Sequence, residues 1–239
     1  MTYCSTISSR GTNNEGDCPL IHFQNVTKDY DNQTAIKDIS FSVDKGEMIF
    51  ITGPSGSGKS TLLKLIYLAE KPDNGDIIIE GWETSGLKES SIPFVRRNIG
   101  IVFQDFRLLE NRTVFENVAL ALRIRGIGEK ETKIRAYDAL KTVNLRHKSD
   151  SYPKTLSGGE QQRVVIARAI VAEPTILLAD EPTGNLDADT AEGVARIFKG
   201  IHAKGTTILI ATHNRELYRN TGKRVLRLDS GVLVGEERG

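Results

Sequence analysis

The chain is poor in cysteine and contains no long apolar run. Its 239 residues include two cysteines, Cys4 and Cys18, whose spacing matches no zinc-binding pattern, and a disulfide-stabilised scaffold would need more. Apolar stretches such as 176–179 and 208–211 fall far short of the ~20 residues that span a bilayer, and no apolar segment follows Met1 as in a secretory signal. We therefore expect an unexported protein suited to a reducing cytoplasm.

An excess of charge of one sign is also missing. Lys and Arg number 32 against 31 Asp and Glu, so the formal net charge is +1. Such a chain creates no long-range field that would collect nucleic acid or an anionic membrane surface. We therefore expect no direct nucleic-acid binding, and partners that are recognised by local surface.

Strand-like patterns follow an irregular start. Residues 1–19 are rich in Ser, Thr, Asn and Gly without periodicity, so we expect a disordered polar leader there and one domain over 20–239. Two segments alternate apolar with polar residues, as half-exposed antiparallel strands do: 21–26 and 39–43. Three are nearly continuous aliphatic or β-branched runs, as expected for buried parallel strands: 48–52, 175–179 and 206–211. The pattern predicts an α/β fold with a mostly parallel central sheet and a small antiparallel one.

A helical pattern replaces the strands over about residues 105–158. Apolar residues recur there at helical spacing in two groups, which Gly126 and Gly128 separate. The groups are Val118, Leu120, Leu122 and Ile124, then Ile134, Ala136, Ala139, Leu140 and Val143. We interpret 105–158 as an inserted helical subdomain. Near the end, 225–228 and 231–234 flank an Asp-Ser-Gly turn, which is typical of a terminal hairpin.

The segment 53–61 indicates a phosphate site. It fits G-x-x-x-x-G-K-[ST], follows an apolar strand and precedes a helix-like run at 62–66. Its glycines let backbone N–H groups approach phosphates, Lys59 suits the β- and γ-phosphates, and the Ser60 hydroxyl suits Mg²⁺. We expect this P-loop to bind ATP through Gly53, Pro54, Ser55, Gly56, Ser57, Gly58, Lys59, Ser60 and Thr61.

Two carboxylates follow the buried strand 175–179. Asp180 would emerge at the C-terminal edge of the sheet, where ligands bind in open α/β folds, and suits the surroundings of Mg²⁺. Because adjacent strand residues face opposite ways, Glu181 can serve the attacking water instead. We predict that Glu181 is the general base, a role worth on the order of 10² to 10⁴ in rate. A simpler interpretation is that both residues only cap the next segment. The P-loop upstream in the same chain favours the catalytic interpretation over it.

The octapeptide 156–163, Leu-Ser-Gly-Gly-Glu-Gln-Gln-Arg, is a second phosphate signal. Ser157, Gly158 and Gly159 at the opening of a helix offer a hydroxyl and unobstructed N–H groups, and the helix dipole adds about half a positive charge there. Because the chain already has its own P-loop, we expect this anion site to serve the ATP of another copy.

With these motifs in this order, the chain resembles the ATP-binding cassette ATPases from about residue 20 onward. The resemblance assigns further residues: Tyr30 matches the aromatic residue that stacks on adenine, Gln104 matches the glutamine that coordinates Mg²⁺, and His213 matches the histidine that reaches the γ-phosphate. Residues 184–187, Gly-Asn-Leu-Asp, match the loop that crosses the dimer interface. The resemblance thus implies catalytic residues Lys59, Gln104, Glu181 and His213, and metal ligands Ser60, Gln104 and Asp180.

The resemblance also implies how such a protein works. Two copies pair head to tail, with each ATP between the P-loop of one copy and Ser157, Gly158 and Gly159 of the other. Hydrolysis to ADP and phosphate reopens the pair, and the motion acts on a separate membrane protein. We accordingly expect an ATP- and Mg²⁺-dependent homodimer that lies peripherally on the cytoplasmic face of a bacterial inner membrane.

Several stretches resemble the branch of this family that serves bacterial cell division, in which the ATPase partners a membrane protein and regulates peptidoglycan hydrolases. They include 94–100 and 103–114. The apolar residues Phe106, Leu108 and Leu109 lie where the family receives its membrane partner. Residues 182–187 are shared with lipoprotein-release and macrolide-efflux ATPases, so a transporter subunit is an alternative function. A nucleotide-binding scaffold with little hydrolysis is another.

Overall fold

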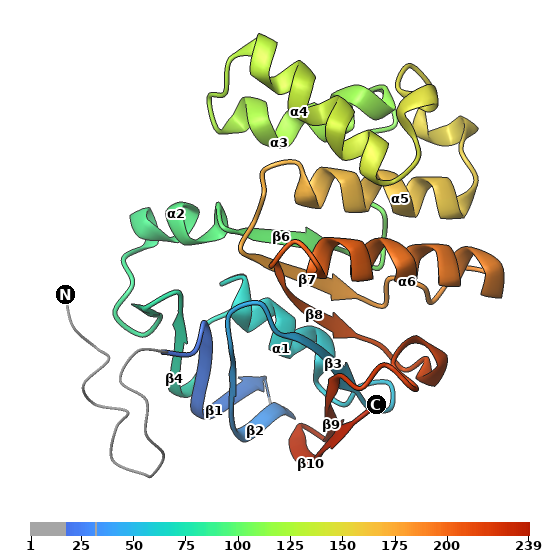
Figure 1. Ribbon diagram of the computed structural model, residues 1–239. Helices are drawn as coiled ribbons and strands as arrows, with labels where there is room; N and C mark the ends of the chain where they lie inside the picture. The colour runs from blue at the N-terminus through green and yellow to red at the C-terminus, as the bar shows by residue number, and fades with distance from the viewer. Residues whose placement is uncertain (1–17, 32) are drawn as a thin grey trace.

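The computed structural model describes residues 18–31 and 33–239. Most of the expected leader, and Cys4 with it, therefore lies outside the described residues. Figure 1 shows a central sheet with helices above it and a second sheet below it. Among the described residues, no helix combines the length and the apolar composition that crossing a membrane requires.

The central sheet has six strands in the order β10-β9-β3-β8-β7-β6. Its members are β3 (Met48–Thr52), β6 (Ile99–Val102), β7 (Ile176–Asp180), β8 (Thr207–Ala211), β9 (Arg224–Asp229) and β10 (Val232–Arg238). All neighbours pair in parallel except β9 and β10, which form the predicted antiparallel hairpin. Every residue of β3 and of β8 is buried, as the continuous apolar runs predict.

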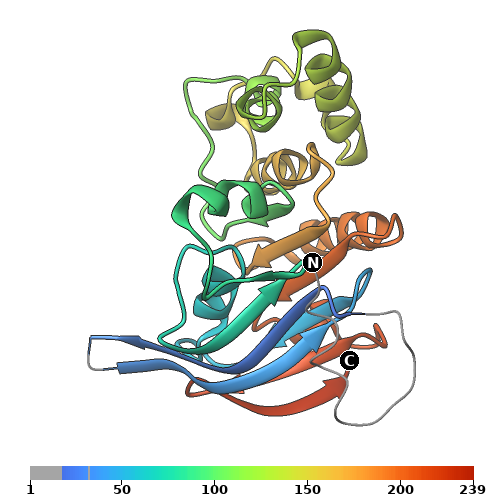
Figure 2. The same cartoon turned by 90° about the vertical axis from the view of Figure 1, so that its left-hand side faces the viewer.

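A smaller antiparallel sheet has the order β2-β1-β4-β5 and lies in the lower part of Figure 2. Its strands are β1 (Ile21–Tyr30), β2 (Gln33–Val43), β4 (Asn74–Ile79) and β5 (Trp82–Glu83). Its inner face is apolar, and the Phe23 and Phe41 rings stack at 4.6 Å. The strand β1 extends beyond Val26 because its polar residues pair with β2 through the backbone. Tyr30, expected just after the first strand, is therefore the last residue of β1.

Helices cover both faces of the central sheet. The helix α1 (Lys59–Ile66) packs between the two sheets, in one core with Ile49 and Ile51. The opposite core joins Met48 and Phe50 to the other helices. Those helices are α3 (Val114–Ile124), α4 (Glu129–Thr142), α5 (Gly158–Ile170) and α6 (Ala188–His202). A short α2 (Ile92–Arg96) precedes β6, and 3-10 turns span Glu89–Ser91, Arg146–Lys148, Pro153–Thr155 and Arg215–Leu217. The α/β prediction, with its parallel central sheet, is confirmed.

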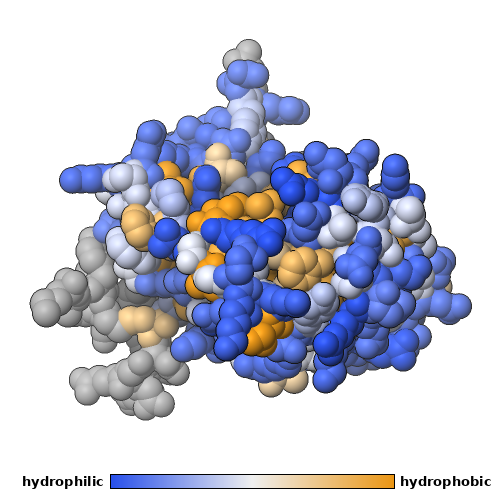
Figure 3. Space-filling model, turned by 90° about the horizontal axis from the view of Figure 1, so that it is seen from above, coloured by the Kyte–Doolittle hydropathy of each residue, from blue (hydrophilic) through white to orange (hydrophobic). Residues whose placement is uncertain are grey.

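Local sequence explains where the upper helices begin. Thr113 caps α3: its hydroxyl accepts the Glu116 N–H, and the Glu116 carboxylate accepts the Thr113 N–H, a reciprocal capping box. The same arrangement starts α5 at Ser157. Apolar Ile124 of α3 and Ile134 of α4 are exposed. Figure 3, the view from above, shows apolar patches between hydrophilic side chains.

Candidate nucleotide-binding and catalytic site

The predicted P-loop connects β3 to α1 at the C-terminal edge of the central sheet. Two of its positions require glycine. Gly53 has φ 152°, and a Cβ there would lie 2.1 Å from the Leu228 carbonyl oxygen. Gly58 has φ 100°, and a Cβ there would lie 2.6 Å from the Ala35 carbonyl oxygen. The Lys59 ammonium is buried and donates to the carbonyls of Gly53 (2.9 Å) and Pro54 (3.0 Å). The loop therefore holds a buried cation beside its backbone N–H groups, as an anion site needs.

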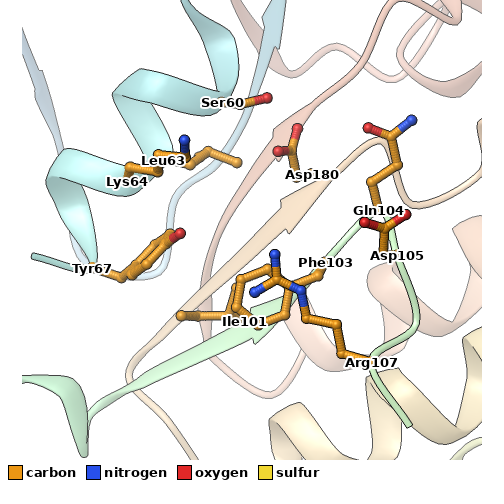
Figure 4. A pocket seen from close by; sticks show the side chains of 10 residues that line it. All are labelled: Ser60, Leu63, Lys64, Tyr67, Ile101, Phe103, Gln104, Asp105, Arg107 and Asp180. Carbon is orange, nitrogen blue, oxygen red and sulfur yellow. The ribbon is translucent and has the colours of Figure 1, made fainter. Parts of the chain in front are cut away.

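Three oxygen-bearing residues line a cavity beside this loop. Ser60 from α1, Gln104 after β6 and Asp180 at the end of β7 are all members of its lining. Figure 4 shows their side chains around one opening, with Tyr67 and Arg107 at the lower side. The cavity has a volume of about 140 Å³. The three predicted Mg²⁺ ligands are thus brought together from three separate elements.

Asp180 is electrostatically perturbed in this cavity. Burial raises the pKa of its carboxyl, and the Ser60 hydroxyl partly opposes the rise. Its Oδ1 is buried without a hydrogen-bond partner. Hydroxyl, amide and carboxylate oxygens are the hard ligands that Mg²⁺ takes, together with water and substrate phosphates. The residues present therefore fit a Mg²⁺ ion that a nucleotide phosphate shares.

The predicted base and the predicted γ-phosphate histidine contact each other. Glu181 Oε1 accepts the His213 backbone N–H at 3.1 Å and lies 2.8 Å from His213 Nδ1. The glutamate side chain is 11% exposed and the histidine 66%. Glu181 also has φ 45°, a left-handed conformation that costs free energy and tends to be kept at functional sites. The pair places a carboxylate at the sheet edge beneath an imidazole that faces solvent.

The octapeptide lies on the other face of the sheet from the P-loop helix, because α5 and α1 belong to the opposite cores. Gly159 is required by packing, since a Cβ there would lie 2.2 Å from Thr190 Cγ2. Gly158 is not, because the nearest atom to its built Cβ is Leu186 Cδ2 at 4.0 Å. The chain's own fold thus explains one glycine of the pair and leaves the other open toward solvent.

Unpartnered buried polar atoms collect on the predicted motifs. In the part of the chain that the structure describes, they occur on His22 and on residues of these motifs: Tyr30, Ser57, Gln162, Arg163, Asp180 and Thr183. An unsatisfied buried group costs about 1–3 kcal/mol, so a native structure keeps such groups where another molecule satisfies them. Their distribution fits one ligand at the P-loop and the sheet edge, and a separate contact at the start of α5.

Two supporting residues were missed from the sequence. Arg168 of α5 donates to the carbonyls of Phe106 (2.9 Å) and Arg107 (2.6 Å), and so ties the octapeptide's helix to the segment after Gln104. Burial lowers the pKa of its guanidinium. Asn117, fully buried in α3, bonds both the N–H and the carbonyl of Leu109. Only chain folding reveals these contacts, although a buried polar residue within an apolar helix face is a weak signal for Asn117.

Known proteins resemble this chain in sequence and in fold. A family model described as "ABC transporter" matches residues 36–184. The "Cell division ATP-binding protein FtsE" of Bacillus subtilis (strain 168) is 48% identical over 219 residues, which are 91% of this chain and 96% of that protein. FtsE of Escherichia coli (strain K12) is 46% identical over 217 residues, 90% of this chain and 98% of that one.

A solved structure agrees in shape over a similar extent. The ATP-binding cassette MJ0796, in a dimeric post-hydrolysis state bound to ADP and Pi, matches with a TM-score of 0.84 and 36% identity. The match covers 91% of this chain and 98% of that chain.

Proposed function

Since this chain belongs to the ABC transporter family and is an ATPase of that family, we propose that it is the ATP-hydrolysing subunit of a bacterial cell-division complex with a membrane protein of FtsX type. The observation that carries the proposal is 48% identity to an FtsE protein along nearly the whole of both chains. In such a complex, ATP binding and hydrolysis drive a conformational change in the membrane partner that regulates peptidoglycan hydrolysis.

ATP binding uses the residues gathered around α1. Tyr30 stacks on the adenine, and residues 53–61 enclose the phosphates. The Lys59 ammonium exchanges its contacts to the Gly53 and Pro54 carbonyls for phosphate oxygens, which are charged and therefore stronger acceptors. Ser60, Gln104 and Asp180 would hold Mg²⁺, which would neutralise phosphate charge.

Hydrolysis uses the pair at the sheet edge. Glu181 takes the proton of the attacking water, and its nearly buried position keeps the carboxylate away from bulk solvent. His213, which already contacts that carboxylate, orients it and reaches the γ-phosphate with its exposed ring. The Glu181 backbone is fixed by donation of its N–H to the Ala211 carbonyl at 2.8 Å.

Two copies complete the site. The start of α5 presents the exposed Ser157 and the N–H of the exposed Gly158 to the ATP held by the other copy. Residues 184–187 cross the interface beside it. The exposed position of Ser157 and Gly158 and the dimeric state of the related MJ0796 cassette support this arrangement.

The membrane partner binds beside Gln104. Phe106 and Leu108 pack partly against the core, while Leu109 is 42% exposed. An exposed apolar residue next to a partly buried apolar pair offers area for an apolar helix of a partner. The chain would thus sit on the cytoplasmic face of the inner membrane through its partner.

Co-sedimentation with vesicles that contain the FtsX-type protein tests the assignment. Wild-type chain should co-sediment, and Leu109→Asp should lose most of the binding. Ile124→Asp, at a still more exposed apolar position (75%) at the C-terminal end of α3, should bind like wild type. Binding to a lipoprotein-release or efflux membrane protein instead would favour a transporter subunit. Absence of phosphate release by any combination would leave only a nucleotide-binding scaffold.

A further inference from the structure

The end of strand β1 is anchored to the segment that follows the P-loop helix. Asp73, which lies between α1 and β4, accepts the Asp29 N–H at 2.8 Å and contacts the Lys28 ammonium at 3.0 Å. Its own N–H donates to the Thr27 carbonyl at 2.9 Å. The backbone N–H of Asp29 and the Lys28 charge hold the pKa of the Asp73 carboxyl below its usual range. This anchor joins the end of the connection between α1 and β4 to the strand that ends at Tyr30.

Lys28 also occupies one face of the Tyr30 ring. Its ammonium lies 5.3 Å from the ring centroid, within the range of a cation–π contact. The Lys28 side chain is only 12% exposed, so Asp73 and the ring both restrict it. A base that stacks on Tyr30 therefore has to use the opposite face.

The other edge of Tyr30 faces α1. Its hydroxyl is buried without a well-formed hydrogen bond. Burial first, and the nearby Glu70 carboxylate second, raise the pKa of the Tyr30 phenol. Thr61, the last residue of the P-loop segment, is a further neighbour of this hydroxyl. Tyr30 is thus restrained by Lys28 on its face and by α1 at its edge.

We propose that Lys28 and Asp73 are positioning residues for the adenine base: they fix the Tyr30 ring at a set distance from the P-loop and leave one face open for stacking. The inference rests on the stacking role proposed for Tyr30. Tyr30 ends its strand at a hairpin tip, where an unrestrained side chain would have to be ordered on each binding event. A cation behind the ring also draws electron density away from the open face, which reduces repulsion with a second π system.

Affinities for ATP and for inorganic triphosphate separate this role from a structural one. In the full-length chain with Mg²⁺, Lys28→Met and Asp73→Asn should weaken binding of a non-hydrolysable ATP analogue roughly two- to tenfold, the cost of ordering one side chain. Inhibition of ATP turnover by inorganic triphosphate, which has no base to stack, should keep its wild-type inhibition constant. Lys28→Arg, which retains the cation, should restore most of the affinity.

Glu129→Gln is the matched control, because it removes an exposed ion pair of similar length to Arg123 far from Tyr30 and should change neither constant. Equal weakening of analogue and triphosphate would overturn the proposal, since it would show a general effect on the P-loop. Unchanged analogue affinity in both variants, with loss in Tyr30→Ala, would overturn it as well. If Tyr30→Ala itself binds the analogue like wild type, the stacking role fails and the positioning role falls with it, whereas the ATPase assignment stands.

Discussion

Gly158 offers a substitution that separates folding from turnover. It is the first residue of α5, its backbone is not in the left-handed region, and a Cβ there would meet nothing closer than Leu186 Cδ2 at 4.0 Å. Alanine therefore fits the folded chain and removes backbone freedom from the unfolded one. Gly158→Ala should raise the free energy of unfolding by about 0.4–1 kcal/mol, which raises Tm by roughly 1–4 °C in a protein of this size.

The same methyl group should block catalysis. If the Gly158 N–H faces the phosphate held by a second copy, a Cβ on the open surface keeps that phosphate from close approach. Loss of one well-placed donor to a transition-state oxyanion costs about 10²–10³ in rate. We therefore expect steady-state phosphate release by Gly158→Ala to fall by about 100-fold or more while the fold is slightly more stable.

Two other glycine variants serve as controls in thermal melts and phosphate-release assays. Gly193→Ala in α6 also meets nothing within 4 Å and should keep full turnover with a similar gain in Tm. Gly159→Ala forces a Cβ to within 2.2 Å of Thr190 Cγ2 and should lose about 1–3 kcal/mol of stability. Wild-type turnover by a folded Gly158→Ala protein would refute the reasoning, and so would a loss of its stability.

Three further outcomes follow from the contacts. Glu181→Gln should bind ATP and shift to a dimer in light scattering while releasing little phosphate; a variant that hydrolyses at the wild-type rate would remove Glu181 from its role. Asn117→Ala should lose about 1–3 kcal/mol in denaturant titration, because the Leu109 N–H and carbonyl lose their partner; an unchanged midpoint would mean that water replaces the amide. The pKa of the Glu160 carboxyl is lowered, chiefly because it accepts the Ser157 N–H. The stabilisation by this capping contact is therefore present above the unfolded pKa of about 4.3 and is lost as pH falls through the lower folded pKa. The Tm difference between wild type and Glu160→Gln should vanish at that low pH, and a constant difference would argue against the cap.

The sequence was most informative where one local rule decides the structure. The continuous apolar run 48–52 can only be satisfied by burial on both faces, and β3 has those bounds. Ser157 followed by two glycines and Glu160 predicts a helix start, and the capping box is there. The predicted end of the first strand at residue 26 was wrong, because the polar residues from there to Tyr30 pair with β2 through backbone groups that carry no sequence pattern.

Contacts between distant residues could not be predicted in this way. Arg168 bonds carbonyls 61 and 62 residues away, and the Lys28–Asp73 pair forms only because strand β1 pairs with strand β4, which begins directly after Asp73. In the sequence, Arg168, Lys28 and Asp73 each look like an ordinary charged surface position. Of the residues around the cavity between Ser60, Gln104 and Asp180, Gln104 was assigned to the metal only because the family's motifs do so.

Mixing two inactive variants tests the central claim, that each ATP site uses residues of both copies. Glu181→Gln keeps the octapeptide intact but has no base, and Gly158→Ala keeps the base but has a blocked octapeptide. In a mixed pair both defects fall in one site, so the other site is intact. Random pairing of equal amounts makes half of the dimers mixed, so we expect about a quarter of wild-type phosphate release. No recovery at any mixing ratio would contradict the shared site.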